Sequence, residues 1–328
     1  MAANIKTEGT DQKKQRLRNQ VIIIAAIVLI FVICHFLTGG KLLRPNNIRT
    51  ILTQVTYPLI LGFGMMFIFT TGRVDLSVGS QVILAANIGA IAVEILGLGY
   101  PGLIIGTMAA LMLTELLCTS CSLFLHIPSW VAGLGCALVF EALGMIIVDA
   151  FSSTMGTSIV YLKHCKELGT FPVIFIVAMI VFIVAYFIFN HTQFGFNLRA
   201  IGSGGEVAEA MGIDRRKTIL IAAVIGAVII AVGGITQLSY TGRFTPTAGM
   251  GSLGGIFKAL AVVLIAGSFS RIFNDVVGCV IGAFMVAGLF NVLTLLGVPS
   301  GTGQEICLGI VVVFCGILSS LRYKGVMK

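Results

Sequence analysis

Ten long apolar runs dominate the pattern of this chain, and short polar stretches separate them. A membrane-spanning helix needs about 20 apolar residues to cross about 30 Å of hydrocarbon. Each run has about that length except the eighth, which is short and has an indistinct start. The runs are approximately 20–38, 48–70, 75–96, 102–125, 129–149, 172–190, 218–240, 256–270, 276–296 and 304–321. The pattern predicts an all-α integral membrane protein with about ten transmembrane helices.

Composition agrees with this prediction, and the charges indicate a topology. Hydrophobic residues make up 57% of the chain, charged residues 10%, and the mean hydropathy is +1.05. Too few polar side chains remain to cover a soluble domain. If both termini are cytoplasmic, fourteen of the 21 Lys and Arg residues lie on the cytoplasmic side and seven on the other, as the positive-inside rule expects. The net charge of +8 therefore indicates topology, and we expect no nucleic-acid partner.

The chain is expected to form one membrane domain with a short tail. Residues 1–16 are polar and basic, and we expect a disordered cytoplasmic tail there. The apolar run that follows resembles a secretory signal, but no small-residue cleavage site comes after it, so we expect a retained first helix. Residues 17–328 then form a single transmembrane domain. Most of the eight cysteines lie in apolar runs and are expected to pack as small hydrophobic residues, with no metal site.

Two parts of the chain echo each other and predict an internal repeat. Each contains a G-x-x-x-G pair in an apolar helix, a break at Pro-Ser and then another helix. The glycine pairs are Gly102/Gly106 and Gly278/Gly282, and the breaks are Pro128-Ser129 and Pro299-Ser300. Such glycines let helix backbones approach closely inside a membrane. Transporters are often built from repeats, with the substrate route between the halves.

The source of energy for transport does not lie in an obvious motif of this chain. No G-x-x-x-x-G-K-[ST] phosphate-binding loop occurs, and no set of residues predicts catalysis or a bound cofactor. Glu115 and Glu141 fall near the middle of expected helices, which leaves ion-coupled secondary transport open as an alternative. No interrupted helix with acidic residues is evident at corresponding points of the two halves. We therefore favour a structural or cavity-lining role for both glutamates.

The polar stretch 191–217 is long for a passive connection and predicts a partner. Its middle, Glu206 to Met211, reads as a short helix between glycines. Val207, Ala210 and Met211 would form a small apolar face and Glu206 and Glu209 a polar one, a shape that can enter a groove on another protein. An ordinary solvated loop is the alternative. A membrane scaffold or receptor that binds a signalling partner at this loop is a further alternative.

Four motifs occur in an order that resembles a known family. They are "TTGRVDLSVGS" (70–80), "IPSWVAGLG" (127–135), "FGFNLRAIGSGGEVAEAMGID" (194–214) and "FTPTAGMGS" (244–252). Together they resemble the permease subunits of bacterial ATP-binding-cassette importers of the ribose or monosaccharide type, including those for autoinducer-2-like sugars. The resemblance covers about residues 45 to 321.

This resemblance implies an architecture and a set of partners. It implies the type II importer fold with ten helices, in which two permease subunits pair and two ATPase subunits bind below them. ATP and Mg²⁺ would be bound by the ATPase subunits, and a sugar-loaded extracytoplasmic protein would dock above. The location would be the bacterial inner membrane. The chain itself would be a non-catalytic subunit without a bound cofactor or metal.

The resemblance also assigns roles to particular residues. Coupling to the ATPase is implied for Asn197, Arg199, Ala200, Gly202, Glu206, Ala208, Met211, Gly212 and Ile213. The signature near the translocation path is Asp75, Leu76, Ser77, Val78 and Gly79. The outward gate or docking surface for the binding protein is Pro246, Thr247, Ala248, Gly249 and Gly251.

The chain departs from the family pattern at several points. Relatives usually carry a second glycine where this chain has Arg73, and they tend to carry a basic residue where it has Glu141. These differences suit one member of a heterodimeric pair of permeases, or a permease for a different ligand. The identity of the solute is not expected to be readable from this chain.

Overall fold

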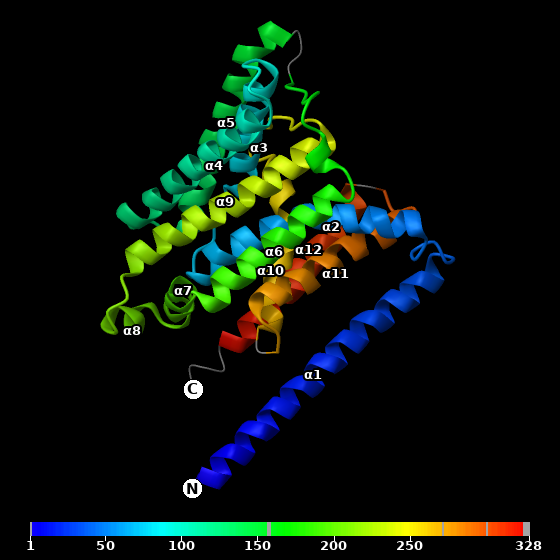
Figure 1. Ribbon diagram of the computed structural model, residues 1–328, viewed down its shortest axis with the longest axis vertical. Helices are drawn as coiled ribbons and strands as arrows, with labels where there is room; N and C mark the ends of the chain where they lie inside the picture. The colour runs from blue at the N-terminus through cyan, green and yellow to red at the C-terminus, as the bar shows by residue number, and fades with distance from the viewer. Residues whose placement is uncertain (1, 156–158, 271, 300, 324–328) are drawn as a thin grey trace. The chain divides into compact units, whose positions relative to one another are not determined.

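The computed structural model describes residues 2–155, 159–270, 272–299 and 301–323, and these residues are helical with short connections (Figure 1). Contacts divide the chain into two compact units, residues 1–55 with 261–328 and residues 56–260. The single domain expected for 17–328 stays a prediction. The helices are α1 (Ala2–Leu37), α2 (Pro45–Thr70), α3 (Val78–Glu94), α4 (Gly99–Phe124), α5 (Ser129–Met155), η1 (Glu167–Gly169), α6 (Val173–His191), α7 (Gln193–Ser203), α8 (Gly205–Ala210), α9 (Arg215–Thr241), α10 (Leu253–Phe269), α11 (Asp275–Leu295) and α12 (Thr302–Tyr323).

Each of the ten predicted apolar runs coincides with one of these helices. Within the described residues, seven helices are long and apolar enough to cross a membrane. Three apolar helices are shorter, at Val78–Glu94, Leu253–Phe269 and Gly303–Ile317. The all-α membrane class is therefore confirmed, whereas the number of helices that cross the membrane stays a prediction. One local expectation differs: residues 2–16 continue α1 as helix and do not form an irregular tail.

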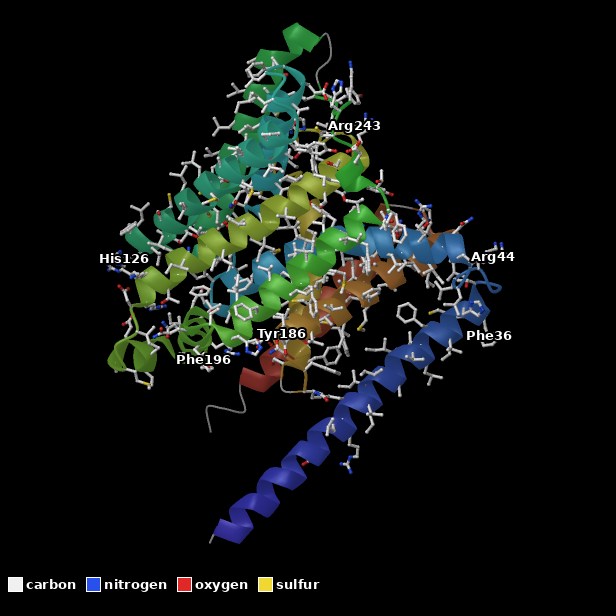
Figure 2. The ribbon with its side chains drawn as sticks, in the orientation of Figure 1. Phe36, Arg44, His126, Tyr186, Phe196 and Arg243 are labelled. Atoms are coloured by element: carbon white, nitrogen blue, oxygen red, sulfur yellow. The ribbon has the colours of Figure 1, made fainter. Side chains whose placement is uncertain are left out.

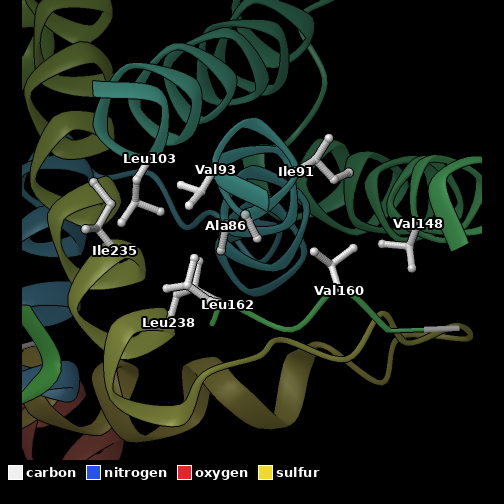
Figure 3. Close-up of a cluster of buried hydrophobic side chains, with 10 residues drawn as sticks. Ala86, Ile91, Val93, Leu103, Val148, Val160, Leu162, Ile235 and Leu238 are labelled. Carbon is white, nitrogen blue, oxygen red and sulfur yellow. The ribbon is translucent and has the colours of Figure 1, made fainter. Parts of the chain in front are cut away.

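Helix α3 is the centre of the larger unit. It packs against α4, α5 and α9, and nearly all of its side chains are buried. Figure 3 shows Ala86 and Val93 of α3 beside Leu103 of α4 and Ile235 of α9, with Leu162 closing the cluster from the segment after α5. A helix that is apolar on all sides must be surrounded by protein or lipid, and here it is surrounded by protein.

Two glycines allow a close crossing of α2 and α9 in this unit. A Cβ atom at Gly64 of α2 would lie 2.8 Å from the Gly226 carbonyl oxygen of α9 and 2.5 Å from the Ile230 side chain. A Cβ atom at Gly226 would in turn lie 3.0 Å from the Gly64 carbonyl oxygen. The two backbones therefore touch directly, which is how small residues hold membrane helices together.

We expect Gly64→Ala to separate α2 from α9 and to destabilise the protein by about 1–3 kcal/mol, the usual cost of overpacking. The measurement is the thermal unfolding midpoint of the purified protein in detergent. Gly135→Ala in α5 is the matched control, because nothing lies within 4 Å of a Cβ atom there. Equal midpoints for the two variants would contradict the close crossing.

The predicted repeat recurs as a local arrangement in each unit. The first glycine pair faces the preceding helix: a Cβ atom at Gly102 would lie 3.3 Å from the Ala92 side chain of α3. The second pair does the same, with Gly278 of α11 close to Ala266 of α10. Both preceding helices, α3 and α10, have 17 residues and follow longer helices of 26 and 27 residues. Of the second Pro-Ser break, Ser300 lies outside the described residues.

Helices α3 and α10 each begin after an irregular segment, residues 71–77 and 242–252. These segments connect α2 with α3 and α9 with α10. Asp75 lies in the first segment, and Glu141 of α5 contacts the second. An acidic side chain therefore lies beside the start of each of these two helices.

In the smaller unit, two asparagines join α2 to α11. The Asn47 amide donates to Oδ1 of Asn291 at 2.8 Å, and the Asn291 amide donates back to Oδ1 of Asn47 at 3.0 Å. Asn47 also donates to the Leu42 carbonyl oxygen at 2.8 Å. Because buried amides are costly without partners, this reciprocal pair fixes the register of the two helices.

Candidate functional site

The polar stretch of the sequence folds into two short helices, α7 and α8, between α6 and α9. We call residues 192–214 the coupling element. The Thr192 side chain begins α7 by accepting a hydrogen bond from the Gly195 N–H at 3.1 Å, and the Asp214 side chain begins α9 by accepting from the Lys217 N–H at 3.0 Å. Gly195 is required at the turn because a Cβ atom there would lie 2.2 Å from the Phe189 carbonyl oxygen. Helix α8 (Gly205–Ala210) matches the predicted short helix, whereas α7 was not predicted.

Aromatic contacts hold α7 in place. The Arg199 guanidinium lies over the Phe196 ring at 4.8 Å and over the Phe189 ring of α6 at 5.3 Å. Phe194 stacks on Phe67 of α2, with ring centroids 6.4 Å apart. Because cation–π and ring contacts of this kind stabilise by about 0.5–2 kcal/mol each, α7 is firmly attached to α2 and α6. Figure 2 shows Phe196 and Arg243 at opposite ends of the larger unit.

Helix α8 presents apolar side chains outward. Val207 is 66% exposed and Met211 is 77% exposed, and Glu206 and Glu209 are exposed beside them. Ala208 is only 2% exposed, so it faces the protein, unlike the other members of the predicted coupling set on this helix. Large apolar side chains exposed on a short polar element indicate a contact surface.

The end of α8 depends on a glycine. Gly212 has φ +87°, a left-handed conformation that suits glycine. Its N–H donates to the Glu209 carbonyl oxygen at 2.9 Å, and the Ile213 N–H donates to the Ala208 carbonyl oxygen at 3.1 Å. These bonds form the usual glycine C-terminal cap. The other predicted coupling residues, Asn197, Ala200 and Ile213, are half-buried.

The coupling element touches the end of α2. A Cβ atom at Gly202 would lie 2.2 Å from the Thr70 carbonyl oxygen. Thr70 is the last residue of α2, and the chain after it is the signature segment, which we define as residues 71–79. The two predicted sites, coupling and signature, are therefore adjacent.

Asp75 organises the signature segment. Its Oδ1 accepts from the Ser77 N–H and from the Ser77 hydroxyl, both at 2.7 Å, and its Oδ2 accepts from the Gln81 amide at 3.2 Å. Asp75 is 5% exposed and Gln81 is fully buried. A buried carboxylate needs such donors, so the acidic residue of the D-L-S-V-G motif fixes the turn into α3. Leu76 is half-buried and Val78 is buried, as their apolar character predicts.

A second buried carboxylate, Glu115 of α4, belongs to the same cluster. Its Oε2 accepts from the Gln81 amide at 3.0 Å and its Oε1 accepts from the Thr119 hydroxyl at 3.0 Å. Glu115 is fully buried and lies nine residues before the end of α4 at Phe124, which is about 14 Å along the helix. The signature segment therefore enters the bundle and runs alongside α4.

Two further contacts fasten the signature segment to its neighbours. Arg73 donates to the Ser122 hydroxyl and, at 3.4 Å, to the Thr119 carbonyl oxygen of α4. The Val74 N–H donates to the Ser129 hydroxyl of α5 at 3.0 Å. Arg73 also interacts electrostatically with the carboxylates of Glu115 and Asp75. The resemblance flagged Arg73 only as a departure from the family pattern, and the structure gives it partners.

At the other end of the unit, residues 242–252 form what we call the outward segment. It leaves α9 at Gly242, whose carbonyl oxygen accepts from the Leu162 N–H at 2.8 Å. Arg243 pairs with Tyr161 through a backbone bridge and donates to the Tyr161 hydroxyl at 2.9 Å. Of the predicted outward residues, Pro246 and Thr247 are half-buried, whereas Ala248, Gly249 and Gly251 are exposed.

Glu141 holds the inner end of the outward segment. Its Oε2 accepts from the Met250 N–H and its Oε1 accepts from the Ser252 N–H, both at 2.8 Å. Glu141 is 5% exposed and lies twelve residues into α5, about 18 Å along the helix. The outward segment therefore reaches the middle of α5, and α10 begins there. These hydrogen bonds support the structural role favoured for Glu141, since they hold the backbone of residues 250–252 against α5.

The signature and outward segments meet. A Cβ atom at Gly79 would lie 2.4 Å from the Ser252 carbonyl oxygen and 2.9 Å from the Ile256 side chain of α10. Sequence reasoning missed both this contact and the role of Gln81. Gln81 could have indicated a buried polar cluster, because an amide within an apolar run needs a polar partner. Among the described residues, no group of three or more His, Cys, Asp or Glu could hold a metal ion.

Long apolar helices, two shorter helices whose starts meet, and an anchored polar element at one end are the features of a polytopic membrane transport subunit. Residues 47–316 match the family described as "Branched-chain amino acid transport system / permease component". That match covers most of the chain, and the chain belongs to this family of permease components.

Curated relatives agree with the family. The chain is 28% identical over 302 residues to the galactose/methyl galactoside import permease protein MglC of Escherichia coli K12, covering 84% of this chain and 87% of that protein. It is 24% identical to the xylose transport system permease protein XylH of the same strain, covering 90% and 91%. MglC of Haemophilus influenzae is 25% identical, covering 98% and 99%. The solved structure "PsaBC from Streptococcus pneumoniae in complex with Fab" aligns at 18% identity with a TM-score of 0.48, covering 89% of this chain and 95% of that chain.

Proposed function

We propose that this chain is the membrane permease subunit of an ATP-driven importer for a monosaccharide or a similar small polar solute. The observation that carries the proposal is the coupling element, which is anchored to α2 and α6 by rings and exposes Val207 and Met211. An ATPase subunit with an apolar groove is the partner that fits this surface. Named relatives import galactose or xylose, which supports a sugar as the solute.

The proposal includes an orientation and further partners. The coupling element faces the cytoplasm together with both termini, and the outward segment faces the opposite side of a bacterial inner membrane. There a sugar-loaded binding protein docks, and a second permease completes the pathway. ATP and Mg²⁺ belong to the ATPase subunits. The departures at Arg73 and Glu141 support a heterodimer of two different permeases, and a complex purified with a single permease species would contradict that part.

The first test is purification of the tagged chain from its native membranes in mild detergent, with identification of the proteins that accompany it. We expect a stoichiometric ATPase subunit and a second permease chain. The same complex in proteoliposomes, supplied with its binding protein and ATP, is expected to take up radiolabelled D-galactose or D-xylose. A chain that purifies alone would contradict the proposal.

The alternative is ion-coupled transport through Glu115 or Glu141. Both carboxylates are engaged by donors of the protein, Glu115 by Gln81 and Thr119 and Glu141 by two backbone N–H groups. These contacts support structural roles. Uptake driven by a proton gradient in vesicles without ATP would favour the alternative and contradict our proposal.

A further inference from the structure

Contacts from the coupling element and from the outward segment both reach the signature segment or the residue just before it. Gly202 of α7 lies against Thr70, directly before the segment, and Ser252 lies against Gly79, its last residue. Gly79 follows Thr70 by nine positions. The signature segment is therefore a short physical connection between α7 and the beginning of α10.

Fixed contacts along the segment make it a stiff connection. The Asp75 carboxylate accepts hydrogen bonds from the Ser77 N–H and hydroxyl. The Val74 N–H donates to the Ser129 hydroxyl of α5. Arg73 donates to the Ser122 hydroxyl and the Thr119 carbonyl oxygen of α4. A flexible loop would absorb a displacement at one end. A segment that is hydrogen-bonded to its neighbours at several points passes the displacement to them, because packed elements respond as discrete units.

Arg73 also lies beside the buried acidic side chains. Asp75 and Glu115 are both at most 5% exposed. The Thr119 carbonyl oxygen accepts from Arg73, and the Thr119 hydroxyl donates to Glu115. Arg73 therefore joins the signature segment to the part of α4 that holds the buried Glu115.

We propose that Arg73 is a positioning residue that fastens the signature segment to α4, so that movement of the coupling element reaches the outward segment through Gly79 and Ser252. The proposal rests on the proposed coupling of residues 192–214 to an ATPase. It adds a route inside the permease and a residue on which the route depends. Physical contact alone does not establish coupling, so the test must measure a response at both ends.

The test uses the complete importer complex and hydrogen–deuterium exchange with and without ATP and vanadate. In the wild-type complex, we expect ATP and vanadate to change exchange both in α7–α8 and in residues 244–252. In Arg73→Met, we expect the ATPase to remain bound and the response in α7–α8 to persist. The response in residues 244–252 should fall by about fivefold or more, the scale of an ordinary allosteric coupling.

A second variant keeps the test informative if Arg73→Met disturbs the fold. Arg73→Met combined with Glu115→Gln removes the basic side chain together with one of its acidic neighbours. We expect this pair to restore thermal stability but not the response in residues 244–252, because the hydrogen bonds from Arg73 to α4 remain absent. Recovery of the response together with stability would show that the route does not need Arg73 and would overturn the proposal.

The remaining outcomes separate this inference from the function on which it rests. An Arg73→Met complex whose response in residues 244–252 equals the wild type would overturn the route through Arg73. Loss of the ATPase from Arg73→Met, with stability intact, would also overturn it, because Arg73 would then act in docking. Absence of any ATPase from the wild-type complex would instead contradict the proposed function.

Discussion

Replacing Val207 and Met211 together by glutamate should abolish co-purification of the ATPase subunits. The two side chains are 66% and 77% exposed, so the change costs the folded permease little. A groove that accepts them would have to bury two carboxylates without partners, which is strongly unfavourable. We expect the affinity for the ATPase to fall by at least about 100-fold.

The measurement is the amount of ATPase retained by the tagged permease, together with the thermal unfolding midpoint of the permease alone. Leu96→Glu is the matched control, because Leu96 is 63% exposed in the connection between α3 and α4 and lies outside the coupling element. Retention of the ATPase by the double variant would show that α8 is not the docking helix. Gly212 is a poor site for this test, because its φ of +87° strains any other side chain.

Replacing Glu141 by alanine should destabilise the permease by about 3 kcal/mol or more, since each of its two hydrogen bonds involves a charged group worth about 1.5–3 kcal/mol. The Met250 and Ser252 N–H groups would lose their acceptor. The outward segment would then lose its attachment to α5. Thermal unfolding in detergent is the measurement, and we expect a fall of about 6 °C or more.

Two further variants sharpen this experiment. Glu141→Gln keeps one oxygen acceptor and should give an intermediate midpoint. Glu305→Ala is the control, because Glu305 is an exposed glutamate at the start of α12 and should change stability by less than about 0.5 kcal/mol. A proton-carrying Glu141 would behave differently: Glu141→Gln would abolish proton-driven uptake and leave the midpoint unchanged.

The positions of the long helices were predictable because each is an apolar run bounded by polar residues. Helix α7 was missed because only three of its residues, Gly195, Leu198 and Ile201, are buried. Of these only two are large apolar residues, which is too few to establish a helical period. The coupling stretch was found from its polar pattern, whereas the roles of its individual residues and the outward motif came from the family resemblance. Whether each of those residues has its expected role stays a prediction.

The contacts within the site were not predictable, for a different reason. Whether Glu141 titrates, lines a cavity or binds backbone depends on which groups of residues 250–252 reach it, and those groups lie more than 100 positions away in the sequence. The same holds for Asp75 and Glu115, which are joined by Gln81. The D-L-S-V-G motif identified an important stretch, but its partners on α4 and α5 became visible only in the fold.

The meeting of the α3 and α10 beginnings has a consequence for selectivity. The amino end of a helix attracts anions, and some transporters use such ends to hold the acidic group of a solute. In this chain an acidic side chain already lies just before each of these ends, Asp75 before α3 and Glu141 against the backbone before α10. A phosphate or carboxylate that approached either end would be repelled by the protein's own acidic group, whereas an uncharged polyol would not.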